Sequence, residues 1–89
     1  MVGGWLRARR RRRLTDRLTV IWCDVLGLEH IGPQEEFLEL GGDSVAAIRI
    51  IGLTEEMADA ELSIQLLLDT RTVAGLAERL ERILAGERP

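Results

Sequence analysis

The chain of 89 residues contains no lysine, one cysteine and one histidine, and these shortages exclude several kinds of site. With Cys23 alone, neither an intramolecular disulfide nor a thiol-rich metal site can form, and we interpret Cys23 as a structural thiol. A Ser/His/Asp triad would need His30, which lies in a predicted loop beside a Gly-Pro turn. Without lysine, the chain also lacks the Gly-Lys-Ser/Thr ending of a phosphate-binding loop. We therefore expect no catalytic residues.

Aromatic residues and long apolar runs are scarce as well. Trp5, Trp22 and Phe37 are the only aromatic residues, so the core must be aliphatic, and a hydrophobic content of 46% is ample for one small folded domain. No apolar run is long enough to span a membrane. The basic N-terminus is not followed by the apolar stretch of a secretory signal. These features predict a cytoplasmic protein with no membrane partner.

The charges divide sharply between the N-terminus and the rest of the chain. Residues 1–17 contain seven arginines and one acid, whereas the remainder contains five arginines and fourteen acids. We interpret residues 1–13 as a basic, poorly ordered arm, although the arginine run could instead extend the first helix. Such an arm could contact an acidic partner or nucleic acid. Because the acidic remainder would repel phosphate, we favour a solvated tail and expect no nucleic-acid partner.

Acidic side chains also gather in the middle of the chain. A metal or acid/base cluster could be built from Glu35, Glu36, Glu39 and Asp43. Their spacing matches no calcium-binding loop, and a solvated acidic surface is the simpler interpretation. We therefore expect no metal site.

Apolar residues recur at helical spacing and predict a helical domain over residues 14–85, followed by a short tail over residues 86–89. Four helices are expected, and their bounds are Leu14 to the C-cap Gly27, Asp43 or Ser44 to about Met57, Ile64 to Leu68 after the cap Ser63, and Val73 to about Leu84 after the cap Thr72.

The first two of these helices are separated by a long loop over residues 28–43, which Ile31, Phe37 and Leu40 should pin to the helices. Gly52 interrupts the second helix and suggests tight packing at that point. The prediction is an all-α bundle of three main helices and one short helix around an aliphatic core.

The most distinctive motif is Phe37-Leu38-Glu39-Leu40-Gly41-Gly42-Asp43-Ser44, at the junction of the long loop and the second helix. Gly41 and Gly42 allow a tight turn and leave the serine hydroxyl open to a bulky enzyme. Asp43 can cap the helix, and the free N–H groups of a helix N-terminus suit a phosphate esterified to Ser44. From these local features alone, an ordinary loop-to-helix cap remains the simpler interpretation.

Three segments resemble, in the right order, the thiolation domains of nonribosomal peptide synthesis. They are Ile21-Trp22-Cys23-Asp24-Val25-Leu26-Gly27-Leu28, similar to the first helix of those domains, Glu36-Phe37-Leu38-Glu39-Leu40-Gly41-Gly42-Asp43-Ser44, similar to their attachment motif, and Thr72-Val73-Ala74-Gly75-Leu76-Ala77, similar to the opening of their last helix. The resemblance covers roughly residues 14–84 and extends to the free-standing, type II carriers of antibiotic pathways. It implies a peptidyl carrier protein with a small four-helix carrier-protein bundle.

The resemblance also implies a cofactor and a set of partners. Ser44 would receive 4′-phosphopantetheine from coenzyme A through a phosphopantetheinyl transferase, at an attachment site shaped by Gly41, Gly42 and Asp43. An adenylation enzyme would load the arm, and condensation or tailoring enzymes would take the aminoacyl thioester from it. The carrier itself is expected to be a non-catalytic monomer.

For partner docking, we expect an exposed apolar patch formed by Val45, Ile48, Ile64 and Leu67, although plain core packing would explain these four residues as well. Within the same class, the alternative is an acyl carrier protein of polyketide or fatty-acid type. Trp22 and the double glycine favour the peptidyl kind. From another class, the alternative is a small helical interaction or nucleic-acid-binding module that uses the arginine arm.

Overall fold

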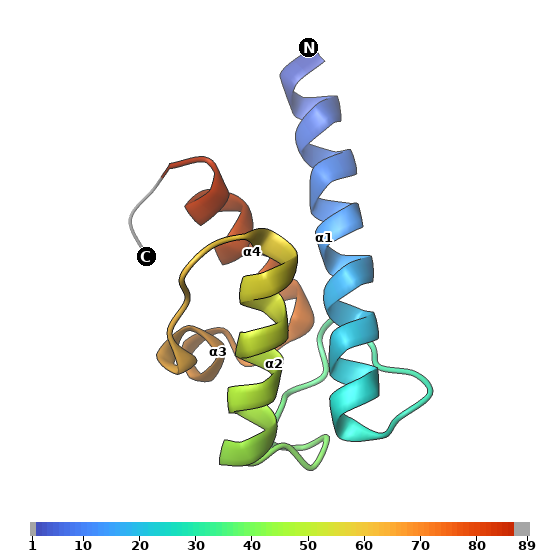
Figure 1. Ribbon diagram of the computed structural model, residues 1–89. Helices are drawn as coiled ribbons and strands as arrows, with labels where there is room; N and C mark the ends of the chain where they lie inside the picture. The colour runs from blue at the N-terminus through green and yellow to red at the C-terminus, as the bar shows by residue number, and fades with distance from the viewer. Residues whose placement is uncertain (1, 87–89) are drawn as a thin grey trace.

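The computed structural model describes residues 2–86, with side chains from Gly4 onward, and this part of the chain contains four helices and no strand. The helices are α1 (Val2–Leu26), α2 (Ser44–Ala58), α3 (Ile64–Thr70) and α4 (Val73–Leu84). Figure 1 shows α1 running opposite to α2, with the short α3 beside the lower part of α2. The predicted all-α bundle of three main helices and one short helix is confirmed.

The core is aliphatic, as the composition requires, with one pair of aromatic rings. Each helix contributes at least one side chain that is fully buried, and these are Leu18 and Trp22 of α1, Ile50 of α2, Leu67 of α3, and Leu76 and Leu80 of α4. Full burial of one such side chain stabilises the fold by roughly 1.5–3 kcal/mol. In α1 the buried side chains Leu14, Leu18 and Trp22 recur every four residues and so form the one face that packs against the bundle.

Side-chain caps set the starts of three helices. Asp43, Ser63 and Thr72 each have extended backbone and accept a hydrogen bond from an N–H in the first turn of α2, α3 and α4 respectively. All three predicted caps are confirmed. The end of α3 lies two residues beyond the predicted Leu68, because the Thr70 hydroxyl donates to the Leu66 carbonyl and Arg71 then takes a left-handed conformation.

Residues 2–13, which we interpreted as a poorly ordered arm, form the N-terminal half of α1, the alternative that the arginine run left open. Arginine is a good helix former, and the absence of apolar periodicity before Leu14 indicates only that this half of α1 has no buried face. The side chains from Gly4 to Arg10 are exposed accordingly. Of the predicted tail, only Gly86 lies within the described residues.

The prediction of tight packing at Gly52 is also wrong. A Cβ added at this position would meet no neighbouring atom within 4 Å, so tight packing does not explain the glycine. Nothing else in the structure explains it either.

The long loop between α1 and α2 is held to the bundle by its backbone as well as by its apolar residues. The Phe37 N–H donates to the Arg71 carbonyl at 2.7 Å, and the Ala74 N–H donates to the Pro33 carbonyl at 2.9 Å. Ile31 and Phe37 are buried, as predicted. These anchors tie the loop to the α3–α4 junction and so fix the point at which the loop delivers the chain to α2.

Candidate functional site

Ser44 is the first residue of α2, and its side chain is exposed. The hydroxyl makes no hydrogen bond within the described part of the chain. Asp43 Oδ1 accepts from the Ala46 N–H at 2.8 Å, which leaves the N–H groups of Ser44 and Val45 directed out of the helix end without an acceptor among residues 2–86. Free N–H groups and the positive end of the helix dipole favour an anion at this position.

The two glycines before Asp43 are required for different reasons. Gly41 has φ +89°, a left-handed conformation that residues with a Cβ resist. At Gly42 the constraint is contact instead, because a Cβ there would overlap the ring of Phe37. The sequence predicted a tight turn at both glycines, but it did not predict that the Phe37 ring leaves no room for a side chain at residue 42.

A pair of buried aromatic rings packs against the core side of this turn. Phe37 and Trp22 meet edge to face, with ring centroids 5.5 Å apart and an interplanar angle of 78°. Both are buried, so the Phe37 ring cannot shift away from Gly42 cheaply. The Gly42 N–H in turn donates to the Phe37 carbonyl at 3.0 Å. The serine is thus positioned by a chain of contacts that begins in the core.

The nearby acidic side chains are engaged in local structure. Glu35 Oε1 accepts from the Gly32 N–H at 2.8 Å, and Glu36 pairs with Arg71 at 3.3 Å. Asp43 is used as the helix cap. Three of the four carboxylates considered for a metal or acid/base cluster therefore have partners within the local structure. Within residues 2–86, no three or more side chains of His, Cys, Asp or Glu come together as a metal site would require.

A shallow depression of about 240 Å³ lies beside the serine, between the end of α1 and the start of α2. Its lining includes Asp43 and Val45, the two neighbours of Ser44, together with Arg49 from the next turn of α2. Both chain neighbours of the serine therefore line the same depression as the Arg49 side chain.

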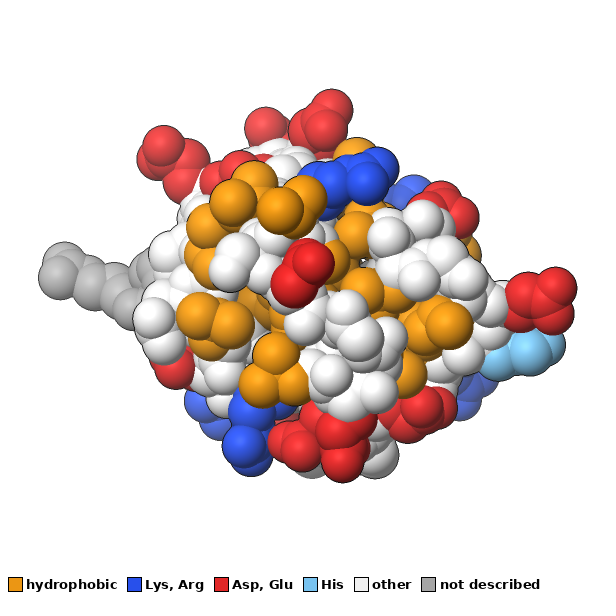
Figure 2. Space-filling model, turned by 90° about the horizontal axis from the view of Figure 1, so that it is seen from below, with side chains coloured by type: hydrophobic (Ala, Val, Ile, Leu, Met, Phe, Trp, Pro, Cys, Tyr) orange, Lys and Arg blue, Asp and Glu red, His pale blue; other side chains and the backbone are white. Residues whose placement is uncertain are grey.

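Three of the four predicted docking residues are exposed. The exposed fractions are 65% for Val45, 56% for Ile48 and 38% for Ile64, on the neighbouring helices α2 and α3. Figure 2 views the molecule from the end at which α2 begins and shows several apolar side chains on that end, with most of the charged side chains, acidic and basic, toward the edge. Apolar exposure of this kind is typical of a surface that partners contact.

Leu67 is the exception, and its assignment to the docking patch is wrong. It is fully buried and belongs to the core, as does Leu66 beside it. The exposed leucine of α3 is instead Leu68, at 46%, and the loop adds Leu38, at 70%. The run Leu66-Leu67-Leu68 contains more leucines than one face of a short helix can bury, so the sequence did indicate that one of them faces outward, but not which.

A model of a known protein family matches most of the chain, including the segment that contains Ser44. The family model for the phosphopantetheine attachment site matches residues 16–80 of this chain. The chain belongs to the phosphopantetheine-attachment family. Its cofactor is therefore 4′-phosphopantetheine, and the described residues fit that group, because an exposed hydroxyl at a helix N-terminus suits a phosphoester.

A curated relative within this family is gramicidin S synthase 2 of Aneurinibacillus migulanus, which is 36% identical over 73 residues. The match covers 82% of this chain but only 2% of the relative. The chain thus spans a very small part of the curated relative, and the activity of that whole protein does not follow from the match.

Solved structures are similar over nearly their whole length. BlmI, a type-II acyl-carrier-protein of Streptomyces verticillus involved in bleomycin biosynthesis, has a TM-score of 0.86 and 46% identity, with 88% of this chain and 94% of BlmI covered. A peptidyl carrier protein in complex with the phosphopantetheine transferase Sfp and coenzyme A has a TM-score of 0.73 and 27% identity, with 75% and 87% covered. Both similarities confirm the four-helix carrier fold.

Among residues 2–86, no helix combines the length and the apolarity that a membrane crossing requires.

Proposed function

We propose that this protein is a peptidyl carrier that holds an aminoacyl group as a thioester on a 4′-phosphopantetheine arm attached to Ser44. The observation that carries the proposal is the exposed Ser44 hydroxyl in the first turn of α2, after a turn whose two glycines are set by the left-handed backbone at Gly41 and by the Phe37 ring at Gly42. The free N–H groups of this turn would stabilise the phosphate of the arm.

The role of the protein is delivery, and we assign no catalysis to its own residues. An arm fixed at one end raises the effective concentration of its cargo at each enzyme that binds the carrier. The partners we propose are a phosphopantetheinyl transferase that uses coenzyme A, an adenylation enzyme, and condensation or tailoring enzymes, all in the cytoplasm. The similarity to a carrier bound to a transferase and coenzyme A supports the first of these.

Attachment is tested by intact-protein mass after incubation with coenzyme A, Mg²⁺ and a broad-specificity transferase. Ser44 and Ser63 are the only serines of the chain, which provides a matched control. Ser44→Ala should gain no mass, while Ser63→Asp, which removes the second hydroxyl but keeps a capping side chain on α3, should gain one phosphopantetheine unit. An equal mass gain in Ser44→Ala would refute the assignment.

Docking is tested at Val45, whose exposure of 65% is matched by Val20 on α1 at 60%. Both Val45→Asp and Val20→Asp should keep the helical circular dichroism of the native chain, because substitutions of exposed residues change stability by less than about 0.5 kcal/mol. Only Val45→Asp should slow loading by the adenylation enzyme, by about tenfold or more, because it places a charge in the interface. Equal loading of the two variants would place the docking surface elsewhere.

A further inference from the structure

The N-terminal half of α1 extends past the core: part of it faces the end of α4 across an open cleft, and its tip projects beyond the rest of the bundle. From Gly4 onward, Leu14 is the first side chain of α1 that the core buries, so residues 2–13 place roughly 18 Å of helix ahead of Leu14. Figure 1 shows this end of α1 extending past α2 and α4. A helix segment of this length without a buried face gains little stability by itself. Its exposure therefore calls for a surface that covers it.

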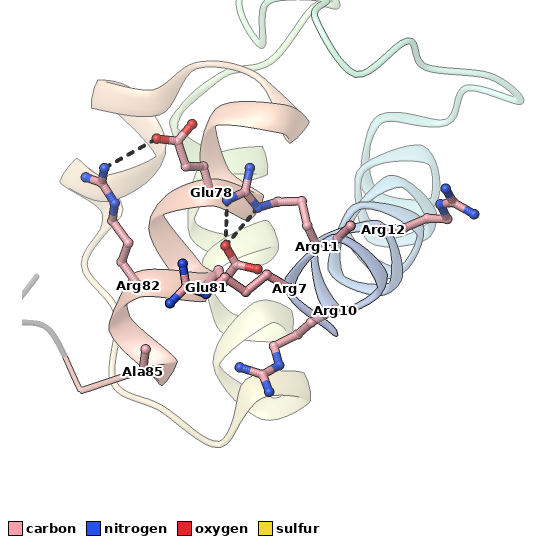
Figure 3. A pocket seen from close by; sticks show the side chains of 9 residues that line it. Arg7, Arg10, Arg11, Arg12, Glu78, Glu81, Arg82 and Ala85 are labelled. Carbon is pink, nitrogen blue, oxygen red and sulfur yellow. Dashed lines mark hydrogen bonds and ion pairs between the residues drawn. The ribbon is translucent and has the colours of Figure 1, made fainter. Parts of the chain in front are cut away.

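The positive charges of this segment lie at the N-terminal end of a helix, where the helix dipole favours negative charge. It contains six arginines and no acid, and arginines three and four residues apart repel one another on a helix. Arg11 is compensated, because its guanidinium binds Glu81 of α4 at 2.5 Å (Figure 3), and this contact raises the pKa of Arg11. The other five make no ion pair with the described residues.

The last turn of α2 and the connection after it carry acidic side chains at the negative end of a helix dipole. Glu55, Glu56, Asp59 and Glu61, with Ala60, line a depression of about 350 Å³. The last turn of α2 contains no basic residue, although the C-terminal end of a helix is negative and favours cations. Glu55 accepts a hydrogen bond from the Leu62 N–H, whereas Glu56, Asp59 and Glu61 are exposed and form no ion pair within residues 2–86. We call this group the acidic corner.

We propose that the arginine-rich end of α1 docks on the acidic corner of a second copy of this chain. Each surface supplies the charge that the other lacks, and each places that charge at a helix end whose dipole favours it. The N-terminus of α1 and the C-terminus of α2 point toward the same end of the molecule (Figure 1). A twofold axis at that end would therefore satisfy both contacts at once and give a closed dimer.

Two apolar side chains on the projecting helix favour a protein partner. Trp5 and Leu6 are 58% and 45% exposed, and the Arg9 guanidinium lies over the Trp5 ring at 4.8 Å. Tryptophan and arginine are enriched at protein–protein interfaces. Ser44 lies at the N-terminal end of α2, whereas the acidic corner lies at the C-terminal end of α2, so the dimer would leave the attachment site free. The monomer expected from the sequence is the competing state.

Sedimentation equilibrium on the full chain, purified free of nucleic acid, decides between the two states. At about 25 mM NaCl the mass should rise from monomer to twice that value with increasing protein concentration. At about 500 mM NaCl, where screening is effective within a few ångströms, it should return toward monomer. A monomer mass at all concentrations in low salt would overturn the proposal, and a mass that rises past the dimer without a plateau would overturn the twofold arrangement.

Charge exchange tests the pairing itself. One variant combines Arg9→Glu, Arg12→Glu and Arg13→Glu, which leaves the contact between Arg11 and Glu81 intact. The other combines Glu56→Arg and Glu61→Arg. Each variant alone should self-associate at least about tenfold more weakly than the native chain, and an equimolar mixture should recover the dimer. A mixture that stays monomeric while both variants remain helical would overturn the pairing.

A further pair of variants separates the apolar contact from a general effect of mutating α1. Trp5→Ala should weaken the dimer, whereas Val20→Ala, also exposed on α1 but outside the projecting segment, should not. Equal effects of the two substitutions would contradict a docking role for the projecting end.

Discussion

At the end of the molecule that bears Ser44, the rings of Phe37 and Trp22 and the backbone of Gly42 are packed in direct contact. At the arginine-rich end, α1 and α4 are joined by an ion pair between Arg11 and Glu81, across an open cleft of about 690 Å³ (Figure 3). The first end is fixed by shape and the second by charge. The serine end should therefore respond to changes of volume, and the arginine end to salt.

The largest effect is expected from Phe37→Ala. Truncation of a buried phenylalanine costs about 3–5 kcal/mol, which is a large share of the roughly 5–15 kcal/mol that holds a whole domain together. Urea denaturation should show this loss in the free energy of unfolding. A loss below about 1 kcal/mol would mean that the turn before Ser44 does not depend on the ring.

Gly42→Ala should have the next largest effect, because the added Cβ would overlap the buried ring of Phe37. Overpacking of this kind costs about 1–3 kcal/mol and should shift the turn that carries Ser44. The same urea titration measures the first effect, and the rate of phosphopantetheine transfer measures the second. Unchanged stability would contradict the steric explanation of the glycine.

Gly52→Ala is the matched control, since it makes the same substitution inside α2, at a position where an added Cβ would meet no neighbouring atom within 4 Å. Here the alanine should stabilise the protein by about 1 kcal/mol, the difference in helix propensity between the two residues. The two alanine variants should therefore move the urea midpoint in opposite directions. A destabilised Gly52→Ala would reveal a packing constraint at that position.

Arg11→Gln should have the smallest effect, below about 1 kcal/mol, because the Arg11 side chain is 43% exposed and partly exposed ion pairs contribute little. The loss should shrink as salt is added. Since its pKa is raised, Arg11 stays charged at all pH values at which the protein is studied, and its charge is not lost until the pH exceeds the ordinary arginine value. A salt-independent loss would indicate packing of the arginine stem instead.

Much of the fold could be predicted because the signals for it are local. Helix caps depend on a side chain and an N–H three residues apart, so Asp43, Ser63 and Thr72 were identified correctly. The position of Ser44 follows from such a cap. Contacts between residues far apart in the sequence could not be predicted in this way. The contact between Phe37 and Gly42 depends on such a pair, because Trp22 packs against the Phe37 ring.

Two failures share a physical cause. Periodicity indicates which side of a helix is buried only when buried and exposed positions differ in type, and neither the arginine run nor the three leucines of α3 offers that contrast. For this reason, a poorly ordered arm was preferred for residues 2–13 and the helix was only the alternative, and Leu67 was assigned to the surface in place of Leu68. The attachment motif itself was identified from its resemblance to a family, since a glycine-rich helix cap alone fits many proteins.

The two tryptophans give each end of the molecule its own optical reporter. Trp22 has no exposed surface and contacts Phe37, whereas Trp5 is more than half exposed beneath a guanidinium. Trp22 should emit at short wavelength and be shielded from acrylamide until the bundle unfolds, while Trp5 should emit at long wavelength and be quenched readily. In the native chain, a quenching curve with two components would therefore follow events at the core behind the serine and at the tip of α1 separately, without any added label.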